Sequence, residues 1–154
     1  MTQEKNQASL EKIMEIVTIK QRVVESEHKR IQIKSPDDAA RVAIPEIGSE
    51  DREVFLVMVL NVKNEIVAIH RASIGSVDAA IVQPREVMKA AILNNGSGII
   101  VAHNHPSYNL SPSPQDIEVT ERLIRAGELL GIQVLDSLIV SEHAFLSLKE
   151  KGYV

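Results

Sequence analysis

Two histidines that stand two positions apart, His103 and His105, are the residues of this sequence whose types and spacing first suggest chemistry. They follow an apolar run at 99–102, and in an extended chain residues i and i+2 point to the same side. Both imidazoles are therefore predicted to converge just beyond the end of a buried strand. Asp116, in the first turn of the next predicted helix, can be brought back to them by the intervening loop. Two imidazoles and a carboxylate are a common ligand set for catalytic zinc, with the fourth position left to water.

A purely structural interpretation of these residues is also open. Asp116 has the spacing to Ser113 that a capping box requires, and a carboxylate is favourable beside the positive end of a helix dipole. His103 and His105 could serve only as loop residues that hydrogen-bond to the backbone. The pair of histidines alone does not separate the two interpretations.

Composition limits the chemistry to nitrogen and oxygen ligands. The chain has 154 residues with five His and no Cys, which excludes a disulfide scaffold, a thiolate zinc finger and a Cys nucleophile. The length suggests one domain with a sizeable core. Only 3% of the residues are aromatic, so aliphatic side chains must fill that core. Three histidines have no predicted role: His28, His70 and His143.

Charge and hydropathy bear on the partners and the compartment. The formal net charge is −4, and non-specific nucleic-acid binding needs clustered Lys and Arg, so a nucleic-acid partner is disfavoured. The longest uncharged apolar run, 54–60, is too short to cross a bilayer. The polar N-terminus lacks the apolar core of a signal peptide. We therefore expect a soluble, cytoplasmic protein without a membrane partner.

The helices that would position the histidines and Asp116 begin at three prolines. Ser35-Pro36 and Ser113-Pro114 each combine an N-cap with a proline at the first helical position, and Pro84 opens a third helix. The first helix is predicted to end at Pro45 or Gly48, and the other two are predicted over 84–94 and 114–131. The N-terminal residues 1–34 are predicted to form a helical and charged arm, with helical spacing at 10, 13, 14 and 17. This arm could contact a second copy, so a homo-oligomer is among the expected partners.

The strands alternate with these helices. They are predicted over 53–60, 66–74, 99–102, 134–140 and 144–148, with a short extended piece at 79–83. The first two strands are joined by a turn and form a hairpin. The alternation predicts an α/β domain over residues 35–154, in which helices flank a mixed β-sheet.

A longer pattern narrows the interpretation. His103, His105, Ser113 and Asp116 occupy every fixed position of His-x-His-x7-Ser-x2-Asp, and the sequence resembles the JAMM (MPN+) metalloproteases that carry this motif. The segments Ala-His-Asn-His-Pro-Ser at 102–107, Pro-Arg-Glu-Val at 84–87 and Gly-Ser-Val-Asp-Ala at 75–79 resemble the RadC branch of that superfamily. The resemblance covers roughly residues 35–154. It implies the JAMM/MPN (cytidine-deaminase-like) fold and a Zn²⁺ ion held by the two histidines and Asp116.

The resemblance also implies catalytic residues. The family pattern has a glutamate near the start of the first core strand, which acts as general acid and base, and Glu53 matches that position. Glu86, in the first turn of a predicted helix, is the rival. Ser113 is implied to stabilise the oxyanion, in addition to its role as a helix cap.

The resemblance implies a zinc-dependent peptidase or isopeptidase-like hydrolase that acts on a peptide or protein substrate. No residue identifies the substrate or the bond. The alternative is a non-catalytic JAMM-fold module that binds a protein or a nucleic acid, since the family is associated with DNA repair. Intact ligands favour the enzyme, and the acidic net charge disfavours a DNA role.

The sequence departs from the RadC pattern at three places. Tyr108 replaces the small glycine usual after His-Pro-Ser, which would alter substrate access or leave a surface aromatic. Asp136-Ser137 stands where the family often has Asp-His. If that histidine supports the site in the family, its absence here affects the adjustment of the site and not metal binding. The polar residues 1–34 are too few for the helix-hairpin-helix region usual before this domain, so the association with DNA repair transfers poorly.

Overall fold

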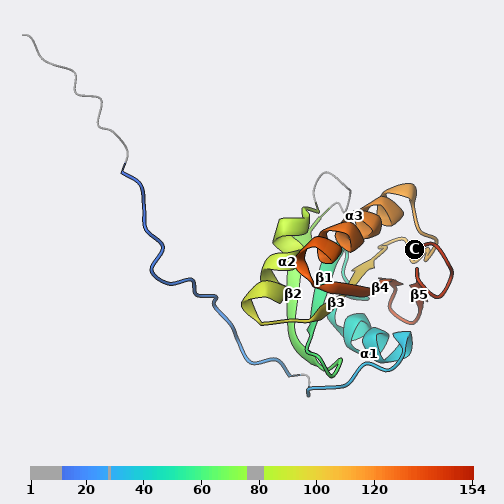
Figure 1. Cartoon of the computed structure of the whole chain (residues 1–154). Helices are drawn as coiled ribbons and strands as arrows, with labels where there is room; N and C mark the ends of the chain where they lie inside the picture. The colour runs from blue at the N-terminus through green and yellow to red at the C-terminus, as the bar shows by residue number, and fades with distance from the viewer. Residues whose placement is uncertain (1–11, 28, 76–81) are drawn as a thin grey trace, which may run out of the picture.

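A single mixed β-sheet forms the centre of the domain (Figure 1). The computed structural model describes residues 12–27, 29–75 and 82–154. Its strands are β1 Val54–Leu60, β2 Ile66–Ile74, β3 Gly98–Asn104, β4 Gln133–Val140 and β5 Phe145–Ser147. The strand order is β2-β1-β3-β4-β5, in which β3 and β4 run parallel and the other neighbours run antiparallel. The predicted α/β class with a mixed sheet is confirmed.

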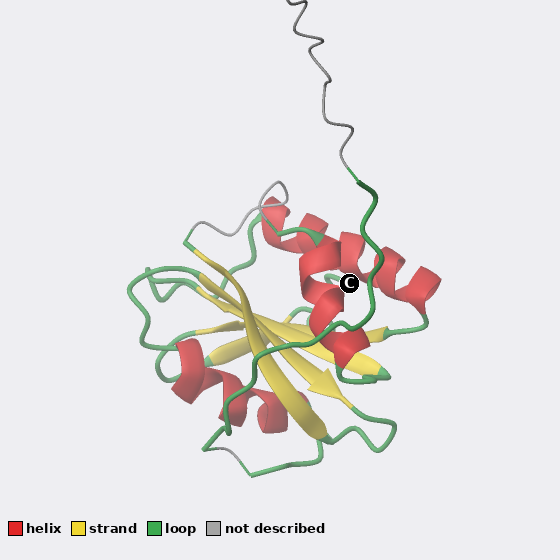
Figure 2. Cartoon of the chain, turned by 90° about the vertical axis from the view of Figure 1, so that its left-hand side faces the viewer, coloured by secondary structure: helices red, strands yellow, loops and turns green. Residues whose placement is uncertain are grey.

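Helices cover both faces of the sheet. The helix α1 Pro36–Ile47 lies on one face, and α2 Pro84–Leu93 and α3 Pro114–Leu130 lie on the other (Figure 2). Every residue of β1 and β3 is buried. Their side chains alternate between two apolar clusters: the even-numbered ones pack with α1, and the odd-numbered ones pack with α2 and α3. This alternation decides which residues at the strand ends share a face.

The predicted helix boundaries agree closely with the structure. Both Ser-Pro signals start helices through capping boxes, one formed by Ser35 with Asp38 and the other by Ser113 with Asp116. The first helix passes through Pro45 and ends at Gly48, so the second of the two predicted ends is right. The hairpin strand β2 has its predicted bounds, whereas β1 begins one residue later than predicted, at Val54.

The N-terminal arm differs from its prediction. Residues 12–26 form no helix, and Ile13 and Val17 are exposed. A short run rich in β-branched residues is a poor isolated helix, because such helices are marginal without a surface that buries their apolar face. The arm contacts the domain through Gln21, whose side-chain amide exchanges hydrogen bonds with that of Asn94, and through a bridge between Gln32 and Glu65.

Some predicted features lie outside the described residues. These are Leu10, His28, residues 79–81 of the predicted extended piece and residues 76–79 of the RadC-like segment at 75–79. Among the helices that the structure describes, none combines the length and the apolar character that a membrane crossing requires.

Gly127 lets the end of α3 approach the connection to β4, and this close approach leads to a stability prediction. A Cβ atom at this position would lie 2.2 Å from the backbone oxygen of Ile132. Gly127→Ala is therefore expected to destabilise the protein by about 1–3 kcal/mol through overpacking, although alanine is otherwise the better helix residue. Urea denaturation measures the change, and an unchanged or raised unfolding midpoint would contradict this account of α3.

Candidate metal centre

The strand β3 delivers the first histidine of the site. It continues to Asn104, two residues beyond the predicted end, because His103 pairs with Phe55 of β1 on one side and Ile139 of β4 on the other. His103 is consequently a buried strand residue, not the loop residue that the sequence suggested. His105 follows directly after the strand and is mostly buried.

The first turn of α3 delivers the carboxylate. Ser113 is the N-cap, and its Oγ accepts a hydrogen bond from the backbone N–H of Asp116 at 3.2 Å. Asp116 Oδ2 in turn accepts the backbone N–H of Ser113 at 2.8 Å. This reciprocal cap fixes the rotation of the Asp116 side chain, which is buried against the end of β3.

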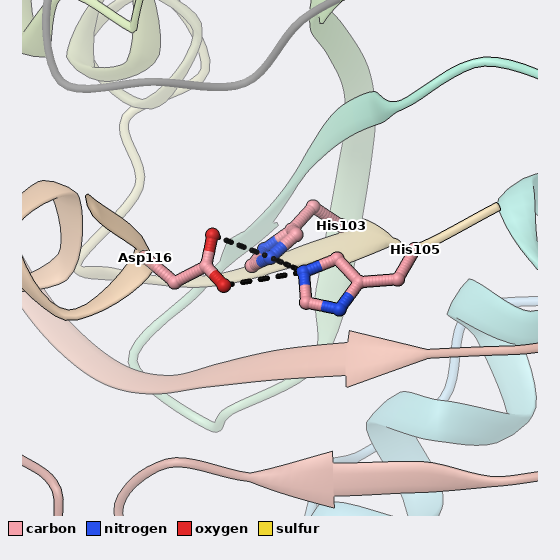
Figure 3. A group of neighbouring side chains, drawn as sticks. All are labelled: His103, His105 and Asp116. Carbon is pink, nitrogen blue, oxygen red and sulfur yellow. Dashed lines mark hydrogen bonds and ion pairs between the residues drawn. The ribbon is translucent and has the colours of Figure 1, made fainter. Parts of the chain in front are cut away.

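The three side chains point toward one another (Figure 3). Nε2 of His103 lies 3.1 Å from Oδ1 of Asp116, and Nε2 of His105 lies 3.1 Å from Oδ2. The two Nε2 atoms are 3.2 Å apart. This group could hold a metal ion, since each residue offers one ligand atom and these atoms all lie within 4.8 Å of one another. Asp116 therefore satisfies the capping interpretation and faces the histidines at the same time.

Other contacts fix both imidazole rings. Nδ1 of His105 lies 2.5 Å from the carbonyl oxygen of Asn109, and donation of Nδ1–H to that oxygen leaves the lone pair on Nε2, where a metal would bind. The ring of His103 stacks on Phe55 with centroids 6.1 Å apart and planes 10° from parallel. Among the described residues, the buried Nδ1 of His103 has no hydrogen-bond partner. Packing rather than hydrogen bonding therefore holds the His103 ring on its far side.

The charges within the group are strongly coupled. The hydrogen bond to Asp116 raises the pKa of His105, against the effect of burial, and the charge of Glu53 acts in the same direction. Burial raises the pKa of Asp116, but hydrogen bonds from His103 and His105 outweigh it, so that this pKa lies far below its usual range. Asp116 is therefore ionised, and its negative charge favours a positively charged group beside it.

The two candidate acid/base glutamates have different surroundings. Glu53 directly precedes β1 and is half-buried, and it shares the odd-numbered alternation of Phe55, which packs on His103. Glu86 is an exposed residue of α2 whose Oε2 lies 2.9 Å from Nζ of Lys89, and this hydrogen bond lowers its pKa. Only Glu53 is among the groups whose charge acts on His105. The choice of Glu53 stays a prediction, but these surroundings favour it.

Two of the three departures from the RadC pattern, at Tyr108 and Ser137, lie close to the site. Tyr108 is exposed and adopts φ +63°, a left-handed conformation, and its N–H donates to the carbonyl of His105 at 2.9 Å. Ser137 is buried, and its Oγ lies 3.0 Å from Oγ1 of Thr120. That Thr120 hydroxyl also lies 2.9 Å from the carbonyl oxygen of Asp116. A hydroxyl pair therefore joins β4 to the first turn of α3.

Sequence reasoning missed two residues that support the site. Phe55 lies within the predicted strand 53–60 without a predicted role at the site, and Asn104 is only the variable position of the His-x-His pattern. The signal for Asn104 was available in principle, because a polar residue at an inward-facing strand position requires a hydrogen-bonding partner. The sequence did not show which face of the sheet Asn104 lies on, because the predicted strand ends at residue 102 and the observed strand ends at Asn104.

Known proteins similar to this chain share the domain. A family model described as a RadC-like JAB domain matches residues 33–153. A UPF0758 protein of Caldanaerobacter subterraneus subsp. tengcongensis is 47% identical over 131 residues, which are 85% of this chain and 56% of the relative. One of Alkaliphilus metalliredigens is 49% identical over 121 residues, 79% of this chain and 52% of the relative. One of Bacillus cereus strain Q1 is 44% identical over 134 residues, 86% of this chain and 60% of the relative.

The matches cover most of this chain but only part of each relative. The chain spans little more than half the length of these relatives, and their names state no activity. The match nevertheless covers the whole of the sheet and all three helices. The mixed sheet with helices on both faces also fits the JAMM/MPN fold that the resemblance implied. The chain therefore belongs to the family of RadC-like JAB domains.

Proposed function

We propose that this chain is a zinc-dependent metallohydrolase that cleaves amide bonds in a peptide or protein substrate. The observation that carries the proposal is the convergence of Nε2 of His103, Nε2 of His105 and the carboxylate of Asp116 in a buried corner at the end of β3. Three protein ligands, with one position left open, are typical of catalytic rather than structural zinc.

The donor atoms support zinc as the metal. Two imidazole nitrogens and one carboxylate oxygen are ligands that zinc binds readily without sulfur. Zinc–nitrogen bonds of about 2.0–2.1 Å at tetrahedral angles imply donor atoms roughly 3.3–3.4 Å apart. Each Nε2 atom lies 3.1 Å from a different oxygen of Asp116, and the two Nε2 atoms are 3.2 Å apart. With one ligand atom per residue, all three atoms lie within 4.8 Å of one another, so these side chains are close enough to share one ion.

The chain's own residues would divide the remaining work. Zinc supplies a Lewis acid that polarises the scissile carbonyl and lowers the pKa of water toward about 7. Glu53 takes a proton from the attacking water as its oxygen adds to the carbonyl carbon. When the C–N bond breaks, Glu53 returns that proton to the leaving nitrogen. The Ser113 hydroxyl accepts the N–H of Asp116, and its own proton can still stabilise the oxyanion.

Peptide cleavage in the presence of zinc tests the proposal. The zinc-loaded protein is incubated with a diverse mixture of linear peptides and of peptides joined through a lysine side-chain amide, and mass spectrometry identifies new termini. We expect products with the zinc-loaded protein and none with the chelator-treated protein. A protein that binds zinc and cleaves neither class of amide would contradict the hydrolase and favour the non-catalytic binding module.

Zinc binding is expected to strengthen with pH. The ion must displace the proton that Asp116 stabilises on His105, whose raised pKa lies above the ordinary value of about 6.5. Below that raised pKa, affinity should fall by about tenfold per pH unit for each displaced proton. Asp116 stays ionised throughout the range of pH 5.5–8, because its pKa is lowered. Titration with a competing chelator across this range measures the slope.

Thermal denaturation gives an independent measure of this pH dependence. The protonated His105–Asp116 pair stabilises the metal-free fold below the unfolded pKa of His105. That contribution is lost as the pH rises through the raised folded pKa. The increase in Tm caused by zinc should therefore grow from pH 5.5 to 8. An affinity and a Tm increase that stay constant over this range would contradict the assignment of His105 as a ligand.

A further inference from the structure

Asn104 is a buried polar residue between the two histidines whose side chain serves neither of them. Alternation along β3 places it on the α1 face, opposite to His103. Its Oδ1 accepts the backbone N–H of Val54 at 2.7 Å. Its Nδ2 donates to the backbone carbonyls of Arg52 at 2.8 Å and Glu50 at 3.2 Å.

These three bonds extend the sheet by means of a side chain. The backbone ladder between β1 and β3 begins with Phe55 opposite His103. One residue farther, the carboxamide of Asn104 takes the place of a neighbouring strand and binds the approaching chain at alternate residues. The segment 50–54 enters β1 from an exposed turn. The backbone carbonyl of Glu53 accepts the N–H of Gly75 at 2.7 Å on the β2 side, and Asn104 attaches the segment to the strand that carries His103 on the other side.

The attached segment contains Glu53. The residues bound by Asn104 stand on both sides of it, Arg52 before and Val54 after. Glu53 has the alternation of Phe55, whose ring stacks on His103. Asn104 therefore holds the backbone on the α1 face while the neighbouring Glu53 belongs to the face on which the histidines converge.

We propose that Asn104 is a positioning residue, which sets the distance between the Glu53 carboxylate and the metal by tying residues 50–54 to β3. The inference rests on the proposed function, in which Glu53 exchanges protons beside the zinc ion. It assigns a specific part to the residue between the two histidines. Asn104 would contact neither the substrate nor the metal.

Cobalt spectroscopy tests the proposal without a substrate, since the visible absorption of Co²⁺ responds to groups around its open coordination position. We compare Glu53→Gln, Asn104→Asp and the double variant. Asn104→Asp keeps the acceptor for Val54 but replaces both donated bonds by repulsion between oxygens. The control is Asn61→Asp, which makes the same chemical change directly after the far end of β1. There Asn61 Oδ1 accepts the backbone N–H groups of Lys63 and Glu65, and its Nδ2 donates to the Glu65 carboxylate.

The expected result is that Asn104→Asp binds one Co²⁺ per chain and loses the part of the spectrum that depends on Glu53. The double variant should match Glu53→Gln, because two changes that act through one group are not additive. Asn61→Asp should leave the spectrum unchanged. If Glu53→Gln alters the spectrum and Asn104→Asp does not, the inference fails while the proposed function stands.

Two other outcomes differ from the failure of the inference alone. If the wild-type protein binds no Co²⁺ or Zn²⁺, the proposed function fails and the inference falls with it. If Glu53→Gln leaves the Co²⁺ spectrum unchanged, Glu53 has no place beside the metal and Asn104 has nothing to position.

Hydrogen exchange of the wild-type protein covers the case in which Asn104→Asp does not fold. The Val54 amide should exchange as slowly as those inside β1, although it lies at the strand end. If Asn104→Asp folds, we expect about tenfold faster exchange of the Val54 amide, because the two bonds that Nδ2 donates no longer hold the segment 50–54 against β3. The size is that expected for a lost hydrogen bond. A Val54 amide that exchanges freely in the wild-type protein would overturn the inference.

Discussion

Asp116→Ala is expected to lower the zinc affinity of the protein by more than about 100-fold. Loss of a hydrogen-bonding partner of a metal ligand costs about 10–100-fold, and Asp116 is proposed as a ligand itself. Its removal also takes away the carboxylate that the Nε2 atoms of His103 and His105 both face. Competition with a chromogenic chelator measures the affinity.

The chain contains a matched control for this variant. Asp38 forms the same capping box with Ser35 at the start of α1, where its Oδ2 accepts the backbone N–H of Ser35 at 3.1 Å. Asp38→Ala should weaken a helix start in the same way and leave zinc binding unchanged. Equal loss of zinc affinity in both variants would show that the effect comes from the helix cap, and Asp116 would no longer be a ligand.

Glu53→Gln is expected to lower the rate of zinc-dependent amide cleavage by about 10²–10⁴-fold, the usual contribution of a general acid/base. Glutamine keeps the size of the side chain but cannot take up the proton of the attacking water. Because Glu53 is not among the three ligand residues, the variant should still bind one zinc ion. Initial rates on any peptide cleaved by the wild-type protein, compared at equal zinc content, give the size of the effect.

Glu86→Gln is the control that separates the two glutamates. It removes the negative charge that pairs with Lys89 on the exposed side of α2, and its rate should stay close to that of the wild-type protein. A large loss of rate in Glu86→Gln with little change in Glu53→Gln would reverse the assignment.

The sequence predicted those parts of the fold that depend on local chemistry. Helix ends are examples, because their signals act within one helical turn and can be predicted from local sequence. The Ser-Pro capping boxes start α1 and α3, and Gly131 ends α3 in the left-handed conformation. The arm at 12–26 was predicted wrongly because its spacing fits a helix, whereas helix formation also requires a surface that buries the apolar face. Such a surface is a property of the tertiary structure.

The site also has a part that local sequence predicts and a part that depends on tertiary structure. His103, His105 and Asp116 were predicted from type and spacing, and the structure brings them together. The contact partners of Phe55 and Asn104 were not predictable, because they depend on the antiparallel pairing of β1 with β3, elements separated by a hairpin strand and a helix. The same pairing brings the backbone on either side of Glu53 to Asn104, so the position of the proposed acid/base residue is a consequence of sheet register.

The metal content of the wild-type protein tests the central claim most directly. Protein purified without chelators, dialysed against zinc and freed of loosely bound ions is analysed by inductively coupled plasma mass spectrometry. The account predicts close to one zinc ion per chain, held by His103, His105 and Asp116. A folded protein that retains no stoichiometric zinc after this loading would contradict it.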